Sequence, residues 1–188
     1  MVGDHVIDSL FDIEGNLLSV RAYTPDGTEI PVPDPSLIPE GINPLLLERV
    51  GGEDSGNVSP MGSGGGGSPS PSGCRMVTVN NEKESTLGFT LFWFHTSTEW
   101  CWTSSSYYIS WAITDWWFSD VDPVWSFQSI TRNHTGYYQY VSGYSNSGHF
   151  NDKQAHFQSC VWVVCQNQYP RNQLWAFYNG AYQWVTED

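Results

Sequence analysis

The chain has 188 residues, of which 39% are hydrophobic and 15% aromatic, and its formal net charge is −13. This balance lacks the clustered Lys and Arg that bind nucleic acid, and it argues equally against binding to an anionic membrane surface. No apolar run approaches the roughly 20 residues of a membrane span, and residues 1–5 have neither the basic nor the apolar region of a secretory signal. We therefore expect no signal peptide and no transmembrane segment.

Residues 1–50 are predicted to be an N-terminal arm. Turn signals at 14–16 and 25–28 favour a β-meander over residues 5–32. Asn43-Pro44 then opens a short helix, because Asn caps a helix and Pro suits its first position. The apolar residues of this helix are Leu45, Leu46, Leu47 and Val50. They have no core of their own, so we expect them to anchor the arm on a partner protein or to pack back on the rest of the chain.

Residues 51–73 read as a linker, because the segment consists mostly of Gly, Ser and Pro. A tether of this kind lets the arm and the following domain move independently.

Residues 74–188 are predicted to be an aromatic β-domain. All ten tryptophans and all four cysteines lie there. Short segments with strand patterns alternate with turn signals, of which Asn179-Gly180 is the strongest hairpin signal. The expected strands are 75–79, 86–95, 100–103, 107–113, 124–130, 136–141, 155–164, 173–178 and 182–185. About eight to nine strands at this spacing predict an all-β fold, an antiparallel β-sandwich or barrel with few helices.

The cysteines indicate two disulfides and an oxidising final location. Four cysteines allow three pairings. We favour Cys74–Cys101 and Cys160–Cys165, because the second pair is close in sequence and the first would clamp the opening strand. Oxidised cysteines without a signal suggest a virion component freed by lysis, another export route, or a chain from which a signal has been removed.

A zinc site is the alternative role for His149, His156, Cys160 and Cys165, which lie within seventeen residues. Zinc sites prefer tighter ligand pairs flanked by loop glycines, whereas an apolar run separates these cysteines. We therefore expect a structural disulfide and no metal or cofactor.

Catalysis has little support in the sequence. Glu99, Asp115, Asp120 and Asp122 could supply a carboxylate pair for glycoside hydrolysis, but acids in turns are usually solvated. A calcium loop at 120–122 would lack its following ligands and its distal Glu. There is no local serine-nucleophile motif. The sequence favours a protein that is not an enzyme.

The aromatic residues are the remaining functional candidates, because a domain of this size cannot readily bury all of them. Exposed rings stack on sugars or form protein interfaces. We expect the binding surface to comprise Trp116, Trp117, Tyr137, Tyr138 and Tyr140.

From Gly88 to Val185 the layout resembles small secreted β-domains of unknown function found in actinobacteria, over about half of the chain. The matching features are 88–91, Trp100-Cys101-Trp102, 123–125, 148–150, 156–160, and Cys165 before Tyr169-Pro170. That family has no established activity, so the resemblance assigns no functional residue. Those proteins begin with a signal peptide, whereas this chain begins with an acidic arm. Display of such a domain on a phage particle would explain the difference.

The sequence thus supports two main hypotheses. The first is a non-enzymatic virion protein, a capsid decoration or tail accessory, that binds a capsid or tail protein through residues 1–50 and forms a homo-oligomer or part of a larger assembly. The alternative is a secreted carbohydrate- or cell-wall-binding module whose aromatic rings contact a cell-surface glycan. Either protein would reside on a virion or outside the cell.

Overall fold

The computed structural model describes residues 3–12, 14–33, 65–66, 72–161 and 164–187. Within these ranges the elements are strands and one 3-10 turn, Ser104–Ser106. The strands are β1 (His5–Phe11), β2 (Leu17–Tyr23), β3 (Glu29–Ile30), β4 (Gly65–Gly66), β5 (Ser72–Glu84), β6 (Thr90–Thr103), β7 (Tyr108–Ser119), β8 (Trp125–Tyr138), β9 (Gly148–Val161), β10 (Val164–Gln168), β11 (Arg171–Phe177) and β12 (Tyr182–Glu187).

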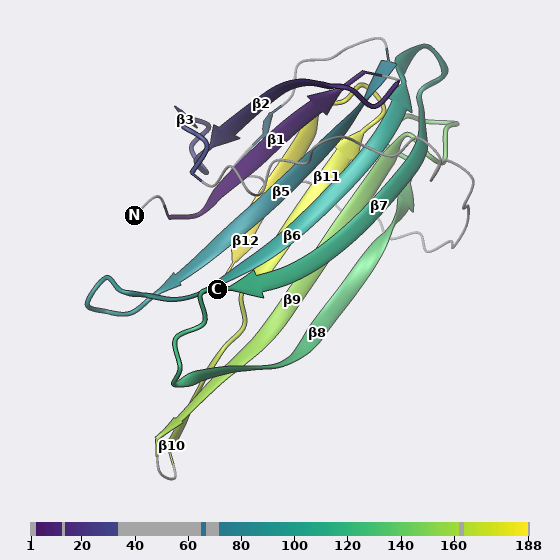
Figure 1. The fold of residues 1–188 in the computed structure, drawn as a ribbon. Helices are drawn as coiled ribbons and strands as arrows, with labels where there is room; N and C mark the ends of the chain where they lie inside the picture. Colours follow the sequence, from purple (N-terminus) through teal and green to yellow (C-terminus); the bar gives the residue numbers. More distant parts are fainter. Residues whose placement is uncertain (1–2, 13, 34–64, 67–71, 162–163, 188) are drawn as a thin grey trace.

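The strands form two antiparallel sheets that pack face to face, so the predicted all-β sandwich is confirmed (Figure 1). Sheet A has the order β3-β2-β1-β5-β6-β7, and sheet B has the order β10-β9-β11-β12-β4 with β8 paired to the other edge of β9. In Figure 1 sheet A lies in front of sheet B. No helix in the described ranges is long and apolar enough to cross a membrane.

The core lies between the sheets. Its largest members include Trp100 and Trp102 from β6 and Tyr182 and Trp184 from β12, each at most 2% exposed. A buried ion pair adjoins them, with Arg75 Nε 3.2 Å from Asp8 Oδ1. The predicted hairpin at Asn179-Gly180 joins β11 to β12, and Gly180 adopts a positive φ of 80°. A Cβ on Gly180 would lie 2.3 Å from the Trp102 ring, so only glycine fits there.

The β-meander expected near the N-terminus is present, and it is part of the sandwich. β1 pairs with β2 on one side and with β5 on the other, in register from His5↔Asn80 to Phe11↔Cys74. Its side chains Val6, Ile7 and Phe11 are at most 1% exposed. β1 and β2 are therefore part of sheet A. An arm that moved independently of the domain would need strands that do not pair with it.

Two further predictions concern the residues after these strands, the short helix and the linker. Leu45, Leu46, Leu47 and Val50, with their predicted helix, lie outside the described residues. Within the expected linker, Gly65–Gly66 pairs with β12 and Ser72-Gly73 opens β5. The described parts of the expected linker therefore belong to strands: Gly65–Gly66 to sheet B and Ser72-Gly73 to sheet A.

The turn at Asn80-Asn81 that the gap between the expected strands 75–79 and 86–95 implies is wrong. Both residues lie within β5 and are fully buried, because their side chains find partners in the fold. Asn80 Oδ1 lies 2.7 Å from His95 Nδ1, and Asn81 donates to the Glu187 carbonyl at 3.1 Å. The chain turns instead at residues 85–89, where Gly88 has a positive φ.

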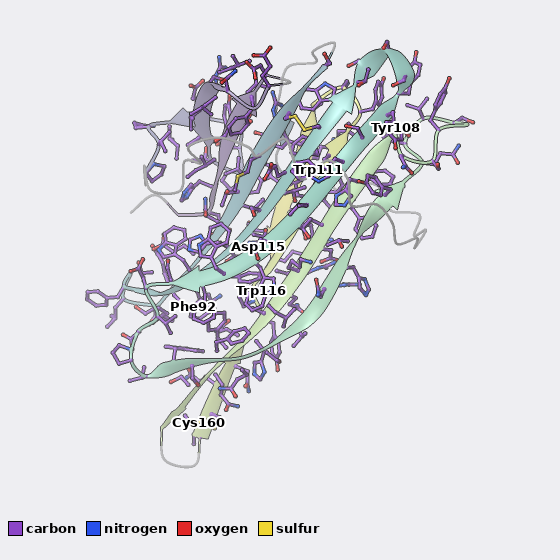
Figure 2. The ribbon with its side chains drawn as sticks, turned by 45° about the vertical axis from the view of Figure 1, so that its right-hand side comes forward. Phe92, Tyr108, Trp111, Asp115, Trp116 and Cys160 are labelled. Atoms are coloured by element: carbon purple, nitrogen blue, oxygen red, sulfur yellow. A yellow bond between two sulfur atoms is a disulfide. The ribbon has the colours of Figure 1, made fainter. Side chains whose placement is uncertain are left out.

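Both predicted disulfides are confirmed. Cys74–Cys101 joins β5 to β6, and Cys160–Cys165 joins β9 to β10. The first is buried, with its cysteines 7% and 9% exposed, whereas both cysteines of the second are exposed. Figures 1 and 2 show that the β9–β10 hairpin, where Cys160 lies, extends beyond the body of the sandwich. Two disulfides fit an extracellular or secreted protein.

Candidate functional site

The five aromatic residues predicted as one surface lie on three different faces. Trp116 points into the sandwich and stacks on Phe127 of β8, with ring centroids 5.6 Å apart (Figure 2 labels Trp116). Trp117 lies on the outer face of sheet A, stacked on His95 at 5.1 Å. Tyr137 points inward onto His149. Strand alternation causes this separation, because neighbouring residues face opposite sides of a sheet.

Tyr138 and Tyr140 do belong to one surface, the outer face of sheet B. Tyr138 lies directly over Gly148, where a Cβ would be 2.4 Å from the ring. Other rings on this face lie beside these two, and we call the whole set the aromatic strip. Its members are Tyr138, Tyr140, Phe150, Trp175 and Phe177.

The contacts within the aromatic strip order its rings. Tyr140 packs on Phe177 with centroids 4.4 Å apart, Tyr138 lies 6.4 Å from Phe150, and Phe150 pairs in register with Trp175. Trp175 and Phe177 are 6% and 7% exposed, whereas Tyr140 is 55% exposed. The buried rings thus form a base on which the more accessible rings rest.

Charged side chains continue the same face along β8, β9 and β11. Arg171 binds the Asp152 carboxylate with two hydrogen bonds, from Nε at 2.8 Å and from Nη2 at 2.9 Å. Its Nη1 donates to Glu187 at 2.7 Å. Arg132 Nε lies 3.0 Å from Asp152 Oδ2, the oxygen that also accepts from Arg171 Nη2. These acidic partners raise the pKa of Arg171 and hold its guanidinium in place.

A depression of about 250 Å³ lies where the aromatic strip meets these charged side chains. It is lined by Arg132, His134, Phe150, Asn151, Asp152, Arg171, Gln173 and Trp175. Apolar rings beside a few fixed polar groups are the usual lining of a small-molecule site. The arrangement can therefore hold a ligand that has both an apolar face and several polar substituents.

The zinc ligands weighed from the sequence do not come together. His149 lies on the inner face of β9, whereas His156 stacks on Tyr169 on the outer side, and the two cysteines form a disulfide. In the described part of the chain, no group of three His, Cys, Asp or Glu side chains could hold a metal ion.

The candidate carboxylates are also dispersed. Asp122 accepts a hydrogen bond from the Val124 amide, and Asp120 accepts one from Ser119, so both serve the β7–β8 turn. Glu99 and Asp115 lie on the outer face of sheet A, in register with Ile113 and Ser97. Burial raises the pKa of Glu99 to about 7.

Sequence reasoning missed the charged part of the site. Arg132, Asp152 and Arg171 come from three strands, and only their pairing in sheet B brings them together. One signal was present: Phe150, Asp152, Gln154 and His156 have the same parity along β9, opposite to the core residue Phe157. That alternation places Phe150 and Asp152 on one outward face.

The chain was also compared with known proteins. No protein-family model, no curated protein and no solved structure matches it. Its function is therefore argued from the residues of this face: the aromatic strip and the charged side chains around the depression.

Proposed function

We propose that this protein is a carbohydrate-binding module without catalytic activity, and that it binds its glycan on the outer face of sheet B. One observation carries the proposal: the aromatic strip adjoins a depression whose rim holds fixed guanidinium, carboxylate and amide groups. The module would act outside the cell, a location that its two disulfides fit.

The chemistry of sugars supports the proposal. A pyranose ring has an apolar C–H face and a rim of hydroxyl groups. The apolar face suits an aromatic ring that is accessible, as Tyr140 is, and the hydroxyl groups suit the planar groups of Arg132, Asp152 and Gln173. Charge-assisted hydrogen bonds of this kind are stronger and more directional than neutral ones.

The rigidity of the face also suits binding. Every residue of the aromatic strip and of the depression except Tyr140 lies on a strand. Asp152 is fixed by three contacts from two arginines. A site whose side chains are already ordered loses little conformational entropy when its ligand binds.

A glycan array tests the proposal, followed by calorimetric titration of the best ligand. Replacing Tyr140 by Ala removes an exposed ring from the strip. We expect about tenfold weaker binding, because the apolar face of the sugar would then remain in water. Tyr108→Ala is the matched control, because Tyr108 is 43% exposed and lies on sheet A.

Two results would contradict the proposal. One is an array without a ligand at millimolar glycan. The other is a ligand whose affinity falls with Tyr108→Ala or Trp117→Ala and not with Tyr140→Ala, because the binding face would then be on sheet A. Near-UV circular dichroism of each variant confirms that its tertiary packing is retained.

A further inference from the structure

We infer that the site is built for an acidic glycan, and that Arg132 binds the carboxylate or sulfate group of the sugar. The inference rests on the proposed function and names the class of its ligand. It follows from the distribution of cations in the chain, the geometry of Arg132, and the position of the aromatic strip.

The cations of this chain are few, and two of them line the depression. The sequence has 7 Lys and Arg against 20 Asp and Glu. Two of the arginines, Arg132 and Arg171, line this one depression together with His134. The local charge there is less negative than the average of the chain, so an anion is repelled less.

The two arginines have different tasks. Arg171 uses Nε, Nη1 and Nη2 on Asp152 and Glu187, so its guanidinium is engaged on both sides. Arg132 contacts Asp152 through Nε, and its side chain is 41% exposed. No hydrogen bond joins the terminal nitrogens of Arg132 to any residue in the described ranges. Among the described residues, Arg132 therefore presents oriented terminal N–H groups that no other side chain or carbonyl engages.

Asp152 provides this orientation. Its carboxylate is 11% exposed and is held by the two hydrogen bonds from Arg171. Arg132 contacts this fixed carboxylate, so its side chain loses less conformational freedom when an anion binds. A planar guanidinium that is already oriented matches a carboxylate or sulfate with two parallel hydrogen bonds.

The charges near the depression nearly cancel, since Asp152 and Glu187 offset the two arginines. Geometry therefore selects the anion more than net charge does. Glu187 contacts Arg171 and is not among the residues that line the depression. Phe150 and Trp175 of the aromatic strip also line the depression, and the sugar ring itself would stack on the strip.

An array of paired glycans tests the inference. It carries oligosaccharides of polygalacturonate, alginate and chondroitin sulfate, each beside its carboxyl-reduced or desulfated counterpart. We expect the full chain to bind at least one acidic form, and to bind its neutral counterpart about tenfold or more weakly, as the removal of a charged hydrogen bond implies.

The variant Arg132→Gln should lose the preference for the acidic form, so that the ratio of its affinities for the acidic and neutral forms falls to about one. Arg21→Gln is the matched control, because Arg21 is an exposed arginine on β2 of sheet A. It should retain wild-type affinity for both forms.

The outcomes separate the two proposals. Equal binding of acidic and neutral forms, or an Arg132→Gln protein that keeps wild-type affinity for the acidic form, overturns the inference and leaves carbohydrate binding intact. Binding to none of the glycans overturns both. A chain that prefers the carboxylate to the sulfate, or the reverse, supports the inference and identifies which group Arg132 accepts.

Discussion

His149 is the residue whose burial has the clearest consequence for pH. It lies between the sheets with its ring against Tyr137, and burial, aided by the positive charge of Lys153, lowers its pKa to about 4. The unfolded chain binds this proton near pH 6.5, before the folded protein does. Stability from His149 is therefore complete above pH 6.5 and is lost as the pH falls towards 4.

We expect His149→Gln to remove this dependence. Between pH 6.5 and 4.5 the wild type should lose on the order of 2 kcal/mol more of its unfolding free energy than the variant does. Urea unfolding at the two pH values measures the difference. His134→Gln, at an exposed position on β8, is the control and should lose as much as wild type. Equal losses in all three proteins would show that His149 does not titrate differently in the folded state.

Glu99 changes the pH dependence of stability in the direction opposite to His149. Its folded pKa of about 7 is above the ordinary value of 4.5, because the side chain is partly buried on the outer face of sheet A. The folded state thus holds the proton more tightly. Stability from Glu99 is complete below pH 4.5 and is lost as the pH rises to 7.

The substitution Glu99→Gln should therefore stabilise the protein at pH 8 and have little effect at pH 4.5. We expect a gain on the order of 1 kcal/mol, after allowance for the solvent screening of a partly exposed group. Thermal unfolding at both pH values measures it. A variant less stable than wild type at pH 8 would contradict this account of Glu99.

At the scale of the element, the two disulfides differ in accessibility. Cys160–Cys165 lies on the projecting β9–β10 hairpin with both cysteines exposed, whereas Cys74–Cys101 packs with Phe11 and Trp111. Thiol–disulfide exchange needs access to a sulfur atom. We expect millimolar dithiothreitol to reduce Cys160–Cys165 first under native conditions. Alkylation followed by peptide mass spectrometry identifies the reduced pair, and simultaneous reduction of both would contradict the expectation.

The elements also show what sequence patterns can predict. The Asn-Gly hairpin and the local cysteine pair were predictable, because each is fixed by residues close together in the chain. Asn80-Asn81 was not, because the partners of its amides are His95 and Glu187, on other strands. A polar pair reads as a turn unless those distant partners are known.

The candidate site was predictable only in part, for the same reason. Tyr138 and Tyr140 share the outer face of sheet B, but Trp116, Trp117 and Tyr137, which we predicted with them, do not. Asp152 and Arg171 are nineteen residues apart and meet only through the pairing of β9 with β11. The composition indicates that some aromatic rings must be exposed. Only the pairing of strands in sheet B shows which charged side chains lie beside those rings.

At the scale of the whole molecule, the N-terminal strands bear on the virion hypothesis. The virion hypothesis, with attachment to a capsid or tail protein through residues 1–50, stays a prediction. The backbone of β1 is not available to a partner strand, because β1 is paired on both sides.

The variant Phe11→Ala tests the integration of β1. Phe11 is fully buried and packs against Cys74, Cys101 and Trp111. We expect its truncation to lower the unfolding free energy by about 3 kcal/mol, as for other buried aromatic side chains. Leu18→Ala on the neighbouring strand β2 is the control, since Leu18 is 61% exposed. If the N-terminal strands were independent of the sandwich, both variants would unfold like wild type.

The pairing of β1 with β5 also sets an order of events during synthesis. Apart from β4, every strand of sheet B comes after residue 124, whereas all of sheet A ends by Ser119. Sheet A can therefore leave the ribosome and form while sheet B is still being translated. For that interval the tryptophans of β6 would have no covering layer. A nascent chain arrested once Ser119 has left the exit tunnel should thus expose a large apolar surface, and a chaperone that binds at the ribosome is the natural candidate for protecting it.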